Sequence, residues 1–124
     1  MYTVTIREHI MIAHSLPDPA FGPAQQMHGA TYVVDVSFYA PELNAQNIVI
    51  DIAIAHDVTK KVLNKLNYQN LDNLAVFTNQ LTTTEFLAKY IHDEIKEAVK
   101  HEFIGKMKVV LNESHVASAS YESA

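Results

Sequence analysis

Two stretches of the chain alternate apolar and polar residues strictly enough to require a β-sheet. From Tyr2 to His14 the apolar side chains stand at even positions, and from Ala30 to Tyr39 they do so again. A period of two places successive side chains on opposite faces of a strand, so each stretch predicts a strand with one apolar face. Glu8 interrupts the first alternation, which we interpret as a bulge.

The middle of the chain has the period of a helix. From Ile52 to Leu66 apolar residues recur at spacings of three and four, which predicts an amphipathic helix. Thr82 and Glu85 have the spacing of a capping box and predict the start of a second helix, which we expect to end near Gly105. From Met107 the period of two returns, so two closing strands are expected.

The order of these elements, β-β-α-α-β-β, favours one fold class. It indicates an α+β fold, a four-stranded antiparallel sheet with two helices on one face. A chain of 124 residues has the size of one ordinary domain. We therefore expect a single domain over residues 1–124.

Charge, hydropathy and cysteine content exclude several classes of protein. A net charge of −5 without a basic cluster argues against nucleic acid as a partner. A mean hydropathy of −0.02 argues against a membrane-spanning protein. The absence of Cys excludes disulfides, thiolate metal ligands and Cys nucleophiles. A secretory signal would need an unbroken apolar run near the N-terminus, where Arg7, Glu8 and His9 stand instead, so we expect a cytoplasmic protein.

Two histidines lie at the facing ends of the first two predicted strands. His14 ends the first strand and His28 precedes the second, each on the parity of its apolar residues. Antiparallel pairing would bring the two imidazoles together, and imidazole is a common zinc ligand. The alternative is that each is only a hydrogen-bonded histidine at a strand end.

Glu113 is the second candidate. It shares the parity of Leu111 in an apolar strand, where an ionised carboxylate is costly unless donors meet it. A ligand with two adjacent N–H groups, such as a pterin or a guanine ring, would supply parallel charge-assisted hydrogen bonds. The alternative is a glutamate at the rim of the sheet, or one paired with a Lys.

Six segments, taken in order, resemble those of one enzyme family. They read IMIAHSL, MHGATY, NIVID, LNYQNLD, TTTEFLA and LNES with the trailing Tyr121, and together they span Ile10 to Tyr121. The chain resembles the 6-pyruvoyltetrahydropterin synthase and 6-carboxytetrahydropterin synthase family, whose members share the tunnelling fold. The resemblance implies that three subunits join their sheets into a barrel and that two such rings stack into a homohexamer with sites between subunits.

The resemblance also implies a zinc site, and this chain departs from it. The family holds zinc with three histidines; His14 and His28 match the first two, but Ala30 stands at the third position. A catalytic zinc normally keeps three protein ligands, so we expect zinc to be weakly held or absent. Tyr32 and His115 are the candidate substitutes for the missing ligand.

The family's proton-transfer groups are also replaced. Ala24 stands at the position of its catalytic Cys, and Asn67 and Tyr68 stand at its Asp-His pair. An amide is not a useful proton acceptor, and an ordinary phenol has a pKa near 10, so neither rebuilds a general base at neutral pH. The sequence therefore assigns no catalytic residue to this chain.

The binding positions are better preserved. Glu113 matches the family's ring anchor, and Thr83 and Glu85 match its segment of sequence PT-x-E-x-LA, although Thr82 replaces the Pro. Glu85 has the alternative role of capping the helix.

These observations favour a divergent member that keeps a pocket for a pterin or purine-like ring but lacks the standard lyase chemistry. Two alternatives stay open. One is an active enzyme with altered chemistry on a pterin side chain, using His14, His28 and His115. The other is a structural or partner-binding oligomer.

Overall fold

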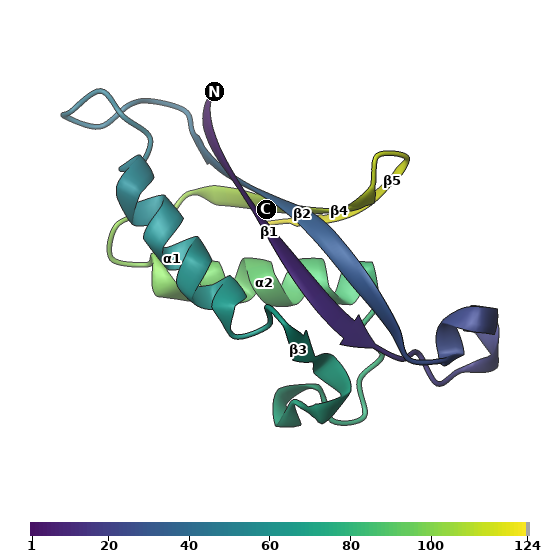
Figure 1. Cartoon of the computed structure of the whole chain (residues 1–124). Helices are drawn as coiled ribbons and strands as arrows, with labels where there is room; N and C mark the ends of the chain where they lie inside the picture. The colour runs from purple at the N-terminus through teal and green to yellow at the C-terminus, as the bar shows by residue number, and fades with distance from the viewer. Residues whose placement is uncertain (124) are drawn as a thin grey trace.

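A computed structural model describes residues 1–123 as one curved sheet with two helices on one face (Figure 1). The sheet has the strand order β3-β1-β2-β4-β5. The five strands and two α-helices are β1 (Tyr2–His14), β2 (His28–Ala40), α1 (Ile52–Asn64), β3 (Gln69–Asn70), α2 (Thr84–Ala98), β4 (Lys106–Ser114) and β5 (Ala117–Glu122). Three short 3-10 helices occupy Pro19–Gln25, Leu71–Asn73 and Ala75–Phe77.

The α+β class is confirmed, but the expected four-stranded sheet and the element order are not. The fifth strand, β3, has two residues and pairs in parallel with Ile12 and Ala13 of β1. Tyr68 N donates to the carbonyl of Met11 at 2.7 Å, and the Asn67 amide oxygen accepts from Met11 N at 2.9 Å. So short a strand leaves no alternation in the sequence, and the 3-10 helices leave no helical stripe, because both depend on contacts with distant residues.

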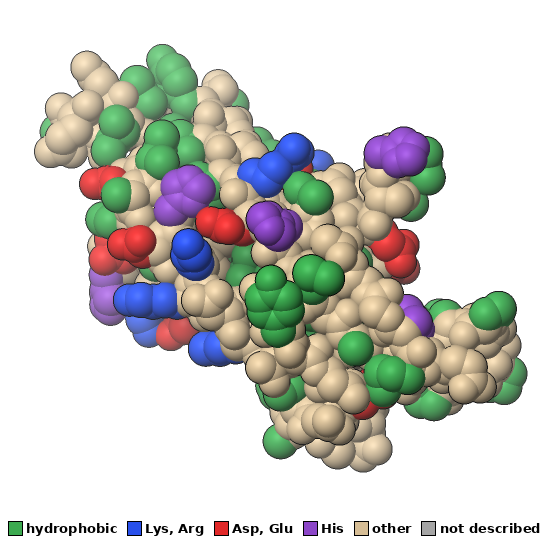
Figure 2. Space-filling model, in the orientation of Figure 1, with side chains coloured by type: hydrophobic (Ala, Val, Ile, Leu, Met, Phe, Trp, Pro, Cys, Tyr) green, Lys and Arg blue, Asp and Glu red, His purple; other side chains and the backbone are tan. Residues whose placement is uncertain are grey.

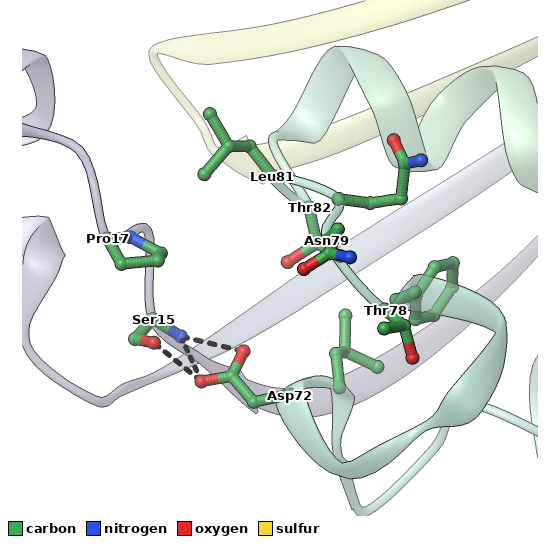
Figure 3. A pocket seen from close by; sticks show the side chains of 10 residues that line it. Ser15, Pro17, Asp72, Thr78, Asn79, Leu81 and Thr82 are labelled. Atoms are coloured by element: carbon green, nitrogen blue, oxygen red, sulfur yellow. Dashed lines mark hydrogen bonds between the residues drawn. The ribbon is translucent and has the colours of Figure 1, made fainter.

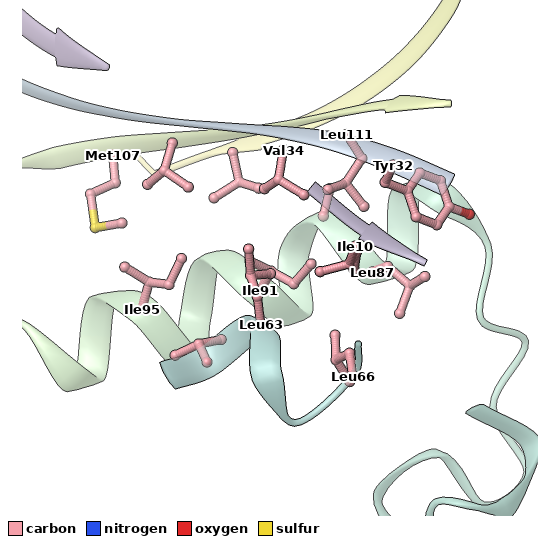
Figure 4. Close-up of a cluster of buried hydrophobic side chains, with 14 of the residues drawn as sticks. Ile10, Tyr32, Val34, Leu63, Leu66, Leu87, Ile91, Ile95, Met107 and Leu111 are labelled. Carbon is pink, nitrogen blue, oxygen red and sulfur yellow. The ribbon is translucent and has the colours of Figure 1, made fainter. Parts of the chain in front are cut away.

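The core lies between the sheet and the helices. The inward side chains of β2 and β4 pack on α2, and α1 covers β1. Figure 4 shows this cluster, in which Val34 and Leu111 of the sheet face Leu87, Ile91 and Ile95 of α2, all five fully buried. Each such side chain contributes roughly 1.5 to 3 kcal/mol by leaving water, so this layer holds the helices in place.

The start of α2 differs from the predicted capping box. Thr83, not Thr82, is the N-cap: its hydroxyl accepts a hydrogen bond from Phe86 N at 3.1 Å. Glu85 is then the second residue of the helix rather than the third, so it is not placed for the reciprocal capping bond. Thr82 is released from capping and, as described below, contacts His14.

The end of α2 also differs from the expectation that the helix reaches Gly105. The helix ends at Ala98, because Val99 leaves helical geometry with φ −98° and ψ 3°. Gly105 lies beyond it, where a Cβ would come within 2.7 Å of both the Tyr39 carbonyl oxygen and the Phe103 ring. Gly105 is therefore required by close packing against β2 and not by a helix cap.

The predicted bulge at Glu8 is absent. β1 and β2 pair without a shift from Tyr2 opposite Ala40 to His14 opposite His28. The Glu8 carboxylate instead lies 3.7 Å from His56 Nδ1 on α1, which explains a half-buried acid in this strand. The sheet's irregularity is in β4 and β5, between Asn112 and Ser114, and it ends the regular alternation just before Glu113.

The surface has charged and apolar regions. On the face in Figure 2, acidic and basic side chains are interspersed, whereas the projecting Pro19–Gln25 helix at the right carries apolar ones. None of the helices within residues 1–123 has the length and apolar character needed to cross a membrane.

Candidate functional site

His14 and His28 meet at one end of the sheet. They are direct partners in the β1–β2 ladder, and their ring centroids are 4.6 Å apart with the planes at 64°. Strand pairing thus brings together the two imidazoles that the sequence singled out. His14 is 3% exposed, so it is held in the interior.

Each imidazole is oriented by a hydrogen bond at Nδ1. His14 Nδ1 lies 2.9 Å from the hydroxyl oxygen of Thr82, itself 2% exposed. His28 Nδ1 donates to the carbonyl oxygen of Gln26 at 2.8 Å. Oxygen partners at Nδ1 are typical of histidines that use Nε2 for a ligand or a proton. With Nδ1 engaged, Nε2 is the nitrogen that each ring could offer to a ligand or a proton.

Burial makes His14 a neutral imidazole. Removal from water lowers its pKa below the ordinary value, and the neighbouring His28 lowers it further. Asp72, Thr82 and Glu113 act in the opposite direction but more weakly. At neutral pH, His14 is thus able to accept a proton or bind an electrophile.

The donor set does not fit the family's three-histidine zinc site within one chain. Ala30 offers only a methyl group at the third position. Tyr32 is fully buried with its hydroxyl 3.4 Å from Thr84 Oγ1, and burial raises its pKa, so it is a poor metal ligand. His115 lies in the exposed turn between β4 and β5. Over residues 1–123, no three His, Cys, Asp or Glu side chains form a group able to hold a metal ion.

Glu113 lies at the same end of the sheet but is exposed. The sequence predicted a carboxylate that needs a partner inside an apolar strand; the irregularity at Asn112 and Ser114 places it in solvent instead. Within residues 1–123 its carboxylate makes no hydrogen bond. Its charge still raises the pKa of both His14 and Tyr32. Glu113 is therefore an available carboxylate at the same end of the sheet as the histidine pair.

The segment at the start of α2 lies beside the same residues. The Thr83 hydroxyl accepts from Phe86 N, which leaves its own proton to donate. Glu85 is exposed, and its charge also raises the pKa of Tyr32. Glu85 is not placed for reciprocal capping, so its carboxylate contributes to the start of α2 only as an acid in the first turn.

The residues at the family's proton-transfer positions have backbone roles here. Asn67 and the amide of Tyr68 bind Met11 and fix β3 to the edge of β1. The Tyr68 side chain is 78% exposed, and its φ of 60° is left-handed. The carbonyl of Ala24 accepts from Leu16 N at 3.0 Å and closes the loop between β1 and β2.

One polar contact next to this site was missed by the sequence reasoning. The Asp72 carboxylate accepts three hydrogen bonds from Ser15 (Figure 3): Oδ2 accepts from the hydroxyl at 2.5 Å and from the amide at 3.1 Å, and Oδ1 accepts from the same amide at 3.2 Å. These residues are 57 positions apart. No local sequence pattern predicts this pair, because the two residues meet only where the Leu71–Asn73 helix approaches the end of β1.

Comparison with known proteins identifies the family. The family model described as 6-pyruvoyl tetrahydropterin synthase matches residues 3–124. This chain belongs to that family. Among curated relatives, the 6-pyruvoyl tetrahydrobiopterin synthase of Drosophila melanogaster is 28% identical over 120 residues, which are 86% of this chain and 71% of that protein.

A second curated relative is the 6-carboxy-5,6,7,8-tetrahydropterin synthase of Bacillus subtilis (strain 168). It is 28% identical over 97 residues, which cover 71% of this chain. The match spans 61% of the B. subtilis protein, less than two thirds of its length.

Solved structures show the same fold. The 6-pyruvoyl tetrahydropterin synthase of Caenorhabditis elegans superposes with a TM-score of 0.86 at 21% identity, covering 99% of this chain and 96% of that one. The Plasmodium falciparum enzyme gives a TM-score of 0.75 at 19% identity, covering 98% and 97%. The sheet and both helices are therefore those of the family.

Proposed function

We propose that this chain is a divergent member of its family that binds a pterin or similar purine-like ring through Glu113. The supporting observation is a carboxylate without a hydrogen-bond partner in residues 1–123, at the end of the sheet where His14 and His28 meet and near enough for its charge to act on His14. A carboxylate accepts two parallel bonds from adjacent ring N–H groups, and such charge-assisted bonds are both strong and directional. Glu113 would thus fix the plane and edge of the ring.

Thr83 and Glu85 are the further ligand-binding residues in this proposal. The Thr83 hydroxyl has a proton left to donate after capping α2. The Glu85 carboxylate is exposed beside it and can accept from ring or side-chain donors of the ligand. This assignment agrees with the likeness of the segment to the family's ligand-binding one.

The proposal also holds that the ordinary lyase reaction is lost. The groups that would move protons are replaced by Ala24, Asn67 and Tyr68, and the latter two are engaged with Met11. Groups that act as a unit fail together when one is removed. Since Ala30 also removes one imidazole, we infer that zinc is held weakly or not at all.

A second candidate function is altered chemistry on a pterin side chain. It is favoured by the oriented, neutral imidazole of His14 beside His28, which has the properties of a general base. His115 would join them only if another subunit brought it near. If neither ring binding nor catalysis occurs, a structural or partner-binding oligomer remains.

Calorimetric titration of the purified protein with neopterin, biopterin and guanine tests the proposal. We expect saturable binding of at least one ring compound and no conversion of 6-pyruvoyltetrahydropterin precursors. Turnover of a bound pterin would favour the second candidate. Absence of binding at millimolar ligand would leave the structural oligomer.

A further inference from the structure

A separate cavity of about 490 Å³ lies beyond the histidine pair. Three segments enclose it: the residues just after β1, the Leu71–Asn73 helix, and the connection that leads to α2 (Figure 3). Thr82 forms part of its wall, whereas His14, His28 and Glu113 do not line it. The cavity is therefore a place for a ligand other than the ring proposed above.

The fixed polar groups of this cavity are acceptors. Ser15 gives its hydroxyl proton to Asp72 at 2.5 Å, and Thr78 gives its own to the Ala75 carbonyl at 2.8 Å. Both hydroxyl oxygens thus keep lone pairs for a ligand. Asp72 Oδ1 keeps one as well, because it accepts from the Ser15 amide alone, whereas Oδ2 accepts from both the hydroxyl and the amide of Ser15. The amides of Asn79 and Gln80 at the rim can serve as donors or acceptors.

The charge of the lining residues determines whether the cavity favours a positively or a negatively charged ligand. Within the described chain, Asp72 is the one charged side chain that lines the cavity. An anion would face this carboxylate and a set of acceptor oxygens without a compensating cation. A bare metal ion is also disfavoured, because hard cations take six or more oxygen ligands, usually several carboxylates among them. A cation that carries its own N–H donors matches the charge of Asp72 and can donate to the acceptor oxygens without the many ligands that a metal ion needs.

The rest of the wall is hydrocarbon. Leu71 and Phe77 are buried beneath the cavity, and Pro17 and Leu81 stand at its sides. These surfaces favour contact with an alkyl group. We propose that the cavity binds small organic ammonium ions, with the ammonium group on Asp72 and the Ser15 and Thr78 oxygens and the alkyl chain on Leu71 and Phe77.

NMR titration of the full chain with n-butylammonium tests this proposal. Saturable shifts should be confined to the amides of the lining, such as Ser15, Asp72 and Asn79. n-Butanol, which has the same chain without the charge, should bind at least about tenfold more weakly. Tetramethylammonium, which has the charge without N–H donors, should also be weaker. Equal binding of n-butanol, or no saturable shifts at the lining, would overturn the proposal.

Variants identify the group that recognises the cation. Asp72→Asn should weaken n-butylammonium at least about tenfold, whereas Asp57→Asn, an exposed acid on α1 outside the cavity, should leave it unchanged. An equal loss in both would show only non-specific charge attraction and would contradict a site. If Asp72→Asn fails to fold, Thr78→Val provides the test. A loss of about threefold in affinity for n-butylammonium would support the site, and an unchanged affinity would refute it.

This inference stands apart from the proposed function. Glu113→Gln should leave binding of n-butylammonium unchanged, because Glu113 does not line the cavity. Ring binding and ammonium binding can therefore succeed or fail separately.

Discussion

At the scale of single residues, the most informative departure from the family pattern is Thr82. A Pro at this position has no side-chain hydroxyl, whereas Thr82 places one 2.9 Å from His14 Nδ1 with both side chains buried. The substitution therefore supplies the buried imidazole with an oxygen partner.

Replacing Thr82 by Val tests this role. Val has nearly the same shape but leaves His14 Nδ1 buried without a partner, so we expect the free energy of unfolding to fall by about 1 to 3 kcal/mol. Urea denaturation measures the change. Thr82→Ser keeps the hydroxyl and should recover most of the loss; equal stability of the Val and Ser variants would show that the bond contributes nothing.

The lowered pKa of His14 predicts a pH dependence of stability. The unfolded chain takes up a proton near the ordinary pKa of 6.5, whereas folded His14 does so only at lower pH. Stability should thus be fully present above about pH 6.5 and should decline as the pH falls through that value towards the folded pKa. Denaturation at a series of pH values, with His14→Asn as the reference, measures this. An NMR titration in which His14 protonates above pH 6.5 would contradict the account.

At the scale of elements, sequence reasoning succeeded where a period was long enough to read. β1 was predicted with its observed ends, because thirteen residues alternate and His14 closes the pattern. It failed for β3, which owes its existence to the hydrogen bonds of Asn67 and Tyr68 with Met11. The histidine pair followed from strand register alone. The contact of Ser15 with Asp72 and that of His14 with Thr82 could not be predicted in this way, because Asp72 and Thr82 approach from distant segments of the chain.

The cap of α2 gives a prediction at this scale. Thr83→Ala removes the acceptor for Phe86 N and should lower the free energy of unfolding by about 1 kcal/mol. Glu85→Gln, by contrast, should change stability by less than about 0.5 kcal/mol, because Glu85 is not the reciprocal partner of a capping box. Thermal or urea denaturation compares the two. A larger loss of stability for Glu85→Gln would indicate that Glu85 does stabilise the start of the helix.

At the scale of the whole molecule, both edges of the sheet that residues 1–123 form lack partners along most of their length. β1 pairs with β3 only over Ile12 and Ala13, and β5 has one neighbour, β4, within residues 1–123. Long unpaired edges invite pairing with another chain. Sheet continuation between copies would satisfy both edges and would bring the Glu113 end of one subunit near another.

The family resemblance implies a homohexamer, a dimer of trimers, and the open edges agree with it, so we expect a mass about six times 13.9 kDa. Light scattering on the purified protein measures it. A trimer would support the joined sheets without the stacking of rings. A monomer at micromolar concentration would contradict the assembly, and with it the expectation that sites form between subunits.

The central claim is that Glu113 anchors a ring ligand, and one comparison tests it most directly. Calorimetric titration should show that Glu113→Gln weakens binding of the ring compound about tenfold or more, because one accepting oxygen becomes a donor that faces ring N–H groups. Glu102→Gln, an exposed acid next to Phe103 at the opposite end of the sheet, should bind as the wild type does. Equal affinity of the wild type and Glu113→Gln, or no ring binding by either, would contradict the account.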